Sequence, residues 1–435
     1  MAVFINAYDT TGMNVALSNI VRDLHTTVTG VQGAITTYAL VMAAFMITGA
    51  KLGDIIGRRR AFTLGVMLYG TGALTTALSA NLAVMFLGWS LLEGLGSALM
   101  IPAVFTLIAS NFPEGKARTA GFAAVAAMTA IGAAMGPLLG GLITTFVTWR
   151  LSFAMEVGIV MIVVALRGKI MDAPLEGARP KMDYVGVILS ALGLACIVLG
   201  ILLAGSYGWL KARQPFSIGG AVFLHKGSIS PVPILAGLGV LILAAFIAWQ
   251  ARREHRGKEP LVHMGIFRHR ALNSGLLVTL VQMFSQGGFM FIVPVFLQIS
   301  LQYSAFKTGL TLLPLTIAVF IASRGAVRLS ERFSQRALVQ IGFLVLISGI
   351  LVTAFTMHSG VSGWAFIPGF VLIGLGLGIG NPPVPNLMLS AVEAAQQSEA
   401  SGLSRSIANL GTSLGTAVTG AVLIATLITA MTART

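Results

Sequence analysis

The sequence predicts an all-α membrane protein that crosses the bilayer many times, and its composition gives two reasons. Hydrophobic residues make up 56% of the 435-residue chain and charged residues only 10%, with a mean hydropathy of +0.89. A soluble domain carries about 25% charged residues, so this chain could not cover a water-exposed surface. The apolar residues also gather in stretches of about 20, the length that one helix needs to span the hydrocarbon core.

Thirteen such stretches follow one another along the chain. They lie near 1–20, 31–50, 61–80, 82–109, 119–145, 151–167, 184–206, 230–251, 271–299, 308–327, 337–357, 363–390 and 402–431. We expect an N-terminal six-helix bundle over 1–170 and a C-terminal bundle over 271–435. The two stretches within 184–251 have no acid or base in their interiors, so we expect two additional linker helices that face lipid or pack against the bundles.

The basic residues predict the orientation of these spans. If the loop with Lys51 and Arg58 is cytoplasmic, 20 of the 28 Lys and Arg residues lie in loops on that side and seven on the other, with Arg405 at the mouth of the last helix. Such an excess is typical of cytoplasmic loops. The net charge of +14 therefore reflects membrane orientation and not a nucleic-acid partner. We expect a multi-pass protein of a bacterial cytoplasmic membrane.

Three acids, Asp9, Glu93 and Glu156, lie inside predicted spans. An ionised acid at membrane depth costs several kcal/mol, so it is rarely kept without a function such as carrying a proton or binding a cation. No Lys or Arg lies at comparable depth in these segments. The three acids are therefore candidates for proton or cation coupling. They favour a transporter over a receptor or scaffold, which has no reason to keep them.

The loop after the second span carries the most specific motif. It consists of Gly49, Gly53, Asp54, Gly57, Arg58 and Arg59. The pattern resembles the cytoplasmic loop motif of the major facilitator superfamily. Its glycines allow two helices and a tight turn to approach closely, while Asp54 can cap a helix or pair with Arg58. The resemblance implies a cytoplasmic gate that breaks and re-forms as the two halves of the protein move.

A second motif lies in the fifth span. It consists of Gly132, Gly136, Pro137, Gly140 and Gly141. It resembles the antiporter motif of the same superfamily, which is typical of proton-coupled exporters and largely absent from uptake carriers. Small residues at this spacing permit close helix packing, and the proline opens the helical hydrogen-bond ladder. The resemblance therefore implies export.

Asp9, Thr10 and Thr11, followed by Asn14, resemble the first helix of the fourteen-helix drug/proton antiporter family. The resemblance covers nearly the whole chain. It implies a major facilitator fold with two six-helix halves, two extra central helices and one helix more than the thirteen predicted here. Three positions depart from the family: Ser90 and Glu93 stand where it has Arg and Gln, and Glu156 lies where it has an Asn-Val-Pro motif. We expect Glu93 to take over part of the proton route.

The candidates for a substrate pocket are weaker. They are Asn14, Tyr38, Gln282, Gln286, Met290, Asn381, Asn386 and Asn409. Methionines and aromatic residues at helical spacing are more often core than binding site. The segment from Asn381 to Asn386 ranks higher because its prolines break a span, and broken helices at membrane depth are tolerated only where the backbone is buried or lines a cavity.

Enzyme chemistry finds no support in the sequence. It contains no Walker loop, no dinucleotide-binding fingerprint and no nucleophile elbow, and its six histidines do not have metal-ligand spacing. We therefore expect no enzyme activity, no cofactor and no metal site. Without an ATP site, the energy for transport would come from an ion gradient.

Together these features predict a proton-coupled secondary exporter of amphipathic small molecules such as drugs. We expect cationic or zwitterionic substrates, because an anion would need a Lys or Arg that the helices do not offer. A lipid or metabolite transporter of the same fold is one alternative, and a non-transporting receptor or scaffold is another. The expected partners are the lipid bilayer, a small-molecule substrate and protons, with no nucleic acid, and we expect a monomer.

Overall fold

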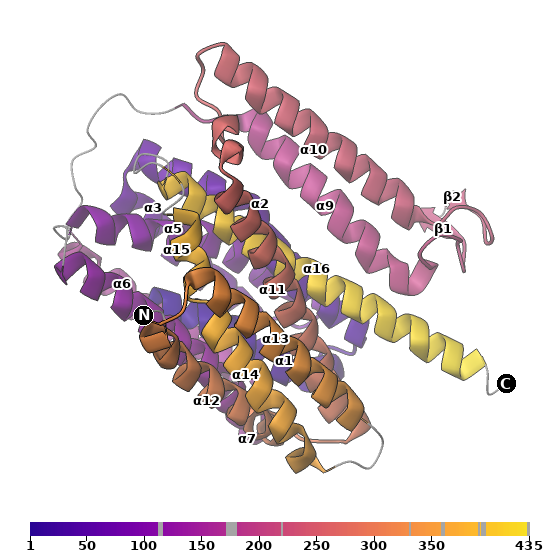
Figure 1. Cartoon of the computed structure of the whole chain (residues 1–435). Coiled ribbons are helices and arrows are strands. Elements are labelled where there is room, and N and C mark those ends of the chain that lie inside the picture. The colour runs from indigo at the N-terminus through magenta and orange to yellow at the C-terminus, as the bar shows by residue number, and fades with distance from the viewer. Residues whose placement is uncertain are drawn as a thin grey trace.

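The computed structural model describes residues 1–111, 116–170, 181–218, 221–329, 332–357, 362–389, 392 and 397–432. Over these ranges the chain forms a bundle of long helices with one small hairpin at its edge (Figure 1). Ten of the described helical segments are long and apolar enough to cross a membrane. The prediction of a many-spanning, helical membrane protein is confirmed.

Each of the first six predicted spans corresponds to one helix or one continuous helical rod. Their bounds are α1 (Ala2–Asp23), α2 (Val28–Ile56), α3 (Arg58–Ala77), α4 (Leu82–Met85) with η1 (Phe86–Glu93) and α5 (Gly94–Asn111), α6 (Lys116–Met135) with η2 (Gly136–Gly140) and α7 (Gly141–Phe146), and α8 (Trp149–Leu166), followed by the short 3₁₀ turn η3 (Arg167–Lys169). η1 and η2 are π-helical segments, which are rare inside helices and frequently occur at functional sites. Both contain candidate residues, Glu93 and Pro137.

The central part of the chain is a pair of helices joined by a hairpin. α9 (Tyr184–Tyr207) and α10 (Pro231–His255) lie side by side along one flank of the bundle (Figure 1). Between them, β1 (Phe216–Ile218) and β2 (Ala221–Leu224) pair antiparallel, with Ile218 opposite Ala221. The sequence analysis does not predict these strands. Their short apolar runs are too brief to give a signal beside the long apolar helices.

The C-terminal part holds the remaining helices. Their bounds are η4 (Met264–Arg268), α11 (Arg270–Val295) with η5 (Phe296–Ser300), α12 (Ala305–Leu329), α13 (Gln335–Thr356), η6 (Gly363–Phe366) with α14 (Ile367–Gly380), α15 (Pro383–Leu389) and α16 (Gln397–Thr432). The predicted span 363–390 is broken between α14 and α15, where the sequence predicts a proline break. Pro383 begins the new helix. Proline lacks an N–H donor, and the first position of a helix does not need one, because an N–H there has no intrahelical acceptor.

Polar side chains start many of the helices. Thr27, Asn81, Asp183, Ser230 and Ser334 each accept a hydrogen bond from a backbone N–H two or three residues later. Such a cap satisfies one of the N–H groups that the first turn leaves without a partner. The caps therefore fix where these spans begin, and the apolar stretches behind them fix their length.

The helices pack in two groups that touch at several places. α1, α2, α3, α5, α6 and α8 pack on one another, as do α11 to α14 and α16. One seam joins α2 to α16, another joins η2 and α7 to α12, and α1 also contacts α11 and α12. In the first seam Gln32 Nε2 donates to the carbonyl of Thr416 at 3.2 Å, and Ser413 Oγ donates to the carbonyl of Thr36 at 3.0 Å. α1 also contacts the C-terminal group, because Ser18 Oγ donates to Gln298 Oε1 at 2.5 Å and Gln298 Nε2 donates to the carbonyl of Val15 at 2.9 Å.

Candidate functional site

The structure brings Asp9, Glu93 and Glu156 into one buried cluster. Asp9 lies in α1, Glu93 at the end of η1 and Glu156 in α8. One carboxyl oxygen from each lies within 4.8 Å of the others. Their exposed fractions are 3%, 0% and 1%, respectively. Three acids that are far apart in the sequence therefore form a single site.

Neutral donors, not cations, hold the cluster. Trp89 Nε1 donates to both carboxyl oxygens of Asp9, at 2.9 and 2.8 Å. The Tyr69 hydroxyl donates to Glu156 Oε2 at 2.9 Å. In the described part of the chain, no Lys or Arg forms an ion pair with these acids. The described ion pairs lie at helix ends and join Arg22 and Arg150 to Asp23, Lys51 to Glu259, Arg253 to Asp183 and His263 to Glu399.

Glu93 is the least satisfied of the three acids. Its Oε1 accepts a hydrogen bond from Thr76 Oγ1 at 3.3 Å, and its Oε2 is buried without a hydrogen-bond partner in the described part of the chain. α3 approaches closely here, because a Cβ on Gly72 would lie 2.6 Å from Glu93 Cγ. Three carboxyl groups this close cannot all be ionised without a cation, since like charges repel strongly away from water. The cluster therefore suits proton binding.

The π-helical turn η1 connects the cluster to a larger cavity. In η1, Ser90 Oγ donates to the carbonyl of Ala34 at 2.9 Å and so fixes η1 to α2. Trp89 stacks on Tyr38, with ring centroids 5.1 Å apart and planes 10° apart. No pattern in the sequence identifies Trp89, Tyr69 or Thr76 as site residues. Aromatic and hydroxyl side chains are common in apolar helices, so nothing in the pattern distinguishes these three.

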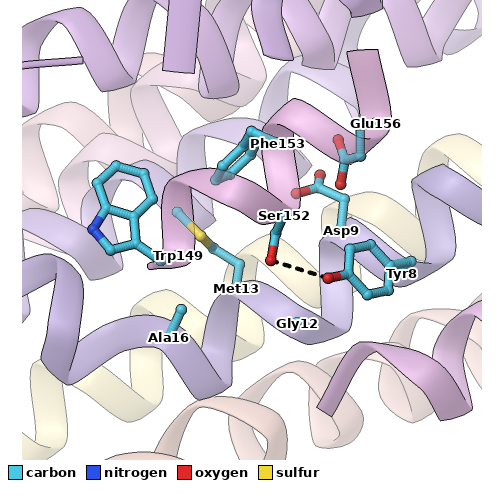
Figure 2. Close-up of a pocket in the computed structure, with 9 residues that line it drawn as sticks. All are labelled: Tyr8, Asp9, Gly12, Met13, Ala16, Trp149, Ser152, Phe153 and Glu156. Atoms are coloured by element: carbon cyan, nitrogen blue, oxygen red, sulfur yellow. Dashed lines mark hydrogen bonds between the residues drawn. The ribbon is translucent and has the colours of Figure 1, made fainter. Parts of the chain in front are cut away.

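A small cavity of about 20 Å³ adjoins two of the acids. It is lined by Tyr8, Asp9, Gly12, Met13, Ala16, Trp149, Ser152, Phe153 and Glu156. Figure 2 shows the carboxyl groups of Asp9 and Glu156 pointing toward each other, with Tyr8 donating to Ser152 Oγ at 3.0 Å. A volume of this size has room for about one water molecule. Two acids, a hydroxyl pair and space for about one water therefore adjoin one another here.

A central cavity of about 180 Å³ lies between α1, α2, η1, α11 and α16. Four predicted pocket residues line it: Asn14, Tyr38, Gln286 and Met290. Trp89 lines it as well, so the indole that binds Asp9 is also part of the cavity wall.

An apolar cavity of about 350 Å³ lies beside the central cavity, between α6, α11, α12 and α14. Gln286 and Met290 line both. Its wall includes Ile131 and Phe320, whose exposed fractions of 40% and 46% are large for apolar residues. A substrate with an apolar body and a polar group would meet both kinds of surface here.

A fourth cavity, the Arg405 cavity, has a volume of about 250 Å³ and lies between α11, α14, α15 and α16. Gln282 and Asn381, both predicted pocket residues, line it. The side chain of Asn386 lies outside the described residues, and Asn409 lines none of these cavities. Arg405 also lines the cavity. The expectation that the helices offer no Lys or Arg is therefore wrong: α16 begins at Gln397, so this arginine lies inside the helix and not at its mouth.

The glycines of the second motif lie against helices of both groups. A Cβ on Gly136 would lie 1.9 Å from Thr11 Oγ1, and one on Gly141 would lie 2.6 Å from the carbonyl of Ala305. On the facing helix, a Cβ on Gly309 would lie 2.0 Å from the carbonyl of Pro137. Gly132 and Gly140 face α1 in the same way. The motif therefore lies where α1, of one group, and α12, of the other, approach the same helix.

The first motif lies at the junction of α2 and α3. Gly57 has a φ of 101°, a left-handed conformation that favours glycine, and Arg58 begins α3 directly after it. A Cβ on Gly49 would lie 2.1 Å from the carbonyl of Ala98, so α2 and α5 are in close contact. The side chain of Asp54 lies outside the described residues, and so does its predicted pairing with Arg58.

The fold and the site together define a class, that of polytopic membrane transporters, because a cavity lies between two helix groups and shares Trp89 with a cluster of buried acids. A sequence model described as Major Facilitator Superfamily matches residues 1–416. The chain belongs to the major facilitator superfamily. It is a multi-pass membrane transporter of small molecules and not an enzyme, as predicted.

Relatives in curated collections agree with this family. The chain is 34% identical over 390 residues to the "Uncharacterized MFS-type transporter EfpA" of Mycobacterium tuberculosis, covering 88% of this chain and 67% of the relative. It is 30% identical over 431 residues to the "Probable actinorhodin transporter" of Streptomyces coelicolor, covering 96% and 70%. Identity to the "Multidrug efflux pump LfrA" of Mycolicibacterium smegmatis is 26% over 428 residues, covering 98% and 79%.

Solved structures support the fold alone. A crystal structure of peptide transporter POT in complex with sulfate matches with a TM-score of 0.62 and 18% identity, covering 100% of this chain and 93% of that one. An auto-inhibited POT family peptide transporter matches with a TM-score of 0.64 and 16% identity, covering 100% and 90%.

Proposed function

We propose that the chain exports drug-like amphipathic small molecules in exchange for protons. One observation carries this proposal: Trp89 lines the central cavity and also donates to both carboxyl oxygens of Asp9. A substrate that displaces the indole therefore changes the hydrogen bonding of the carboxyl cluster. Protonation of the cluster in turn changes how firmly the indole is held in the cavity wall, because coupling between two binding sites is reciprocal.

The names of relatives support the export direction. They include a multidrug efflux pump, a probable actinorhodin transporter and a tetracenomycin C resistance and export protein. The glycine and proline motif in η2 has the pattern typical of exporters, and it lies between helices of the two groups. Both findings favour movement of substrate out of the cell.

The two adjoining cavities favour amphipathic substrates. Burying an apolar body in the apolar cavity would contribute roughly 25 cal/mol per Å², while Asn14 and Gln286 in the central cavity offer hydrogen bonds. The nearby cluster of acids favours a cationic group on the substrate over an isolated anionic one. We further propose that one chain transports alone, since each cavity is enclosed by helices of the same chain.

A lipid is the second candidate substrate, and one observation favours it. The apolar cavity has exposed apolar residues in its wall, including Ile131, Ile317 and Phe320. A cavity whose wall reaches an apolar outer surface could take up a lipid chain from the bilayer. A competition experiment in proteoliposomes separates this candidate from drug export. It measures whether phosphatidylglycerol or phosphatidylcholine reduces transport of a dye.

The test is substrate flux in proteoliposomes with and without a pH gradient. We expect uptake of a lipophilic dye into inside-out vesicles to need an acidic interior and to stop when an uncoupler is added. Asp9→Asn should abolish gradient-driven flux. Asp23→Asn is the matched control, because Asp23 pairs with Arg150 at a helix end, away from the cluster. Undiminished flux after the gradient is dissipated would remove the proton-exchange proposal.

A further inference from the structure

The Arg405 cavity has no acidic side chain among its described lining residues. They are Thr279, Gln282, Met283, Asn381, Val384, Met388, Ala400, Ser404, Arg405 and Ala408. Val384, Met388 and Ala400 also belong to an apolar cluster with Val262 and Ile266, so the cavity lies near the segment between α10 and α11. The stretch from Arg252 to Arg270, which includes this segment, carries six of the basic residues and is predicted to be cytoplasmic. Arg405 is the one charged side chain among the described lining residues.

Arg405 is held in place but is not neutralised. Its guanidinium lies 4.2 Å from the centroid of the Phe105 ring, which belongs to α5 in the other helix group. In the part of the chain that the structure describes, Arg405 makes no ion pair. The acid on its own helix, Glu399, pairs with His263 at 3.0 Å. Guanidinium groups pack on aromatic rings, and their N–H donors have the fork geometry that binds a carboxylate or phosphate.

Neighbouring amides complete a polar site. Asn381 Oδ1 is buried and has no hydrogen-bond partner among the described residues. Its amide can therefore turn to present either its oxygen or its NH₂ group. Gln282, which is 3% exposed, lines the same cavity. Asn381 also lines the apolar cavity, and Met283 also lines the central cavity. One molecule can therefore place its body in those cavities and a polar group beside Arg405.

We propose that the Arg405 cavity binds the anionic group, a carboxylate or a phosphate, of an amphipathic substrate. The cavity system then carries charges of opposite sign at two places, with the buried acids near Trp89 and the guanidinium of Arg405 on α16. Such an arrangement selects zwitterions over simple cations, because each charged group of the substrate meets its complement. This inference rests on the proposed export of amphipathic compounds and names the substrate class.

The test is equilibrium binding to the full chain in phosphatidylcholine nanodiscs, without any gradient. Rhodamine 110 carries a free carboxylate, and rhodamine 123 is its methyl ester, so the pair differs in one anionic group. We expect Arg405→Gln to weaken binding of rhodamine 110 by about tenfold, the loss of one charge-assisted hydrogen-bond pair. Binding of rhodamine 123 should change by less than about twofold, and Arg405→Lys should retain part of the preference because it keeps the charge.

Arg336→Gln is the matched control, since Arg336 is an exposed arginine in the first turn of α13. It should leave the binding of both dyes unchanged. Equal loss of both dyes in Arg405→Gln would overturn the proposal and leave Arg405 as a contact between the helix groups. The proposal would also be overturned if Arg405→Gln kept the wild-type preference for rhodamine 110 over rhodamine 123.

Two further arms identify the source of the anion. Inorganic phosphate that displaces rhodamine 110 from the wild type but not from Arg405→Gln supports an anion site open to water. If phosphatidylglycerol in the nanodisc abolishes the difference between the two dyes in the wild type, the anion is a lipid head group and the substrate assignment is wrong. Because no gradient is used, a failure of proton-driven flux leaves this result unaffected, so the two proposals can fail separately.

Discussion

At the scale of single residues, Trp89 connects the central cavity directly to the buried acids. Its indole N–H is shared by the two oxygens of Asp9, while its ring stacks on Tyr38 in the central cavity. A tryptophan can do both because it has one donor on a large flat ring. The hydrogen bond is to a carboxyl group, so it is stronger than one between neutral groups when that group is ionised.

We predict that Trp89→Phe keeps substrate binding but impairs coupling. The phenyl ring can still stack on Tyr38, whereas both hydrogen bonds to Asp9 are lost. Gradient-driven flux should fall by about tenfold, the equivalent of one hydrogen bond to a charged group, with substrate affinity nearly unchanged. Trp249→Phe is the control, because Trp249 Nε1 donates to Asp183 at 3.0 Å, away from the cluster. Equal effects of the two variants on flux would contradict the assignment.

We predict that Glu93→Gln makes the protein more stable and less active. The variant removes one acid from a crowded cluster and replaces a buried oxygen that has no partner with an amide that can donate to a neighbour. Thermal unfolding in detergent should show a gain of about 1 kcal/mol, typical of one net hydrogen bond, while proton-coupled flux of a cationic dye falls.

The matched control for this variant is Glu259→Gln, at an exposed acid that lies 3.6 Å from Lys51. It should change stability by less than about 0.5 kcal/mol, as surface substitutions do. A loss of stability in Glu93→Gln would mean that the three acids already form a satisfied network, and it would remove the reason to assign them a transport role.

At the scale of helices, glycine contacts set how closely the moving elements approach. α1 lies against η2, where Gly136 meets Thr11 and the carbonyl of Tyr8 without room for a Cβ. The π-helical turn coincides with Pro137, whose missing N–H loosens the ladder at that point. A loosened turn between two glycine contacts allows small helix shifts that a regular helix would resist.

We predict that Gly136→Ala destabilises the protein by about 1–3 kcal/mol, because the added methyl group overpacks the contact with α1. Flux should fall further than the loss of folded protein explains. Gly158→Ala is the control, since a Cβ on Gly158 would meet nothing within 4 Å. Thermal unfolding measures the loss of stability in each variant, and flux per folded molecule measures the loss of transport. A neutral Gly136→Ala would show that α1 can move away freely and that the motif is not a packing constraint.

At the scale of the whole molecule, two helix groups share the site unequally. The carboxyl cluster comes entirely from the N-terminal group, in α1, η1 and α8, whereas the central cavity is bounded by both groups. A rocking motion of one group against the other would therefore change the cavity while leaving the cluster intact. Such motion about a fixed midplane site is the general form of alternating access.

Topology is the prediction that belongs to this scale. We expect the segment with Arg256 to face the cytoplasm and the hairpin region with Lys226 to face outside, as the excess of basic residues requires. After Cys196→Ala, the variants Lys226→Cys and Arg256→Cys can each be labelled from outside with a membrane-impermeant thiol reagent, since both positions are exposed. Only the first should react. Labelling of the second alone would invert the orientation of every loop.

Much of the fold could be predicted because membrane helices leave a simple record in the sequence. Length and hydropathy locate the spans, and Pro383 locates the break in the twelfth, since helical backbone can lose its hydrogen bonds only where other groups replace them. The hairpin β1–β2 could not be predicted, because its strands are short. Arg405 was misplaced because the polar start of α16, with Glu399 and Ser404, has the composition of a loop although it is helical.

The sequence by itself determined the solvent, the spans, the family and the identity of the buried acids, because each of these follows from local composition or a short motif. Only the tertiary structure decided that Asp9, Glu93 and Glu156 meet, that Trp89 connects them to a cavity, and that Arg405 faces a separate cavity with no acidic partner among the described residues. Those contacts join α1, η1, α8 and α16, and their geometry depends on how helices far apart in the chain pack, which no local pattern encodes.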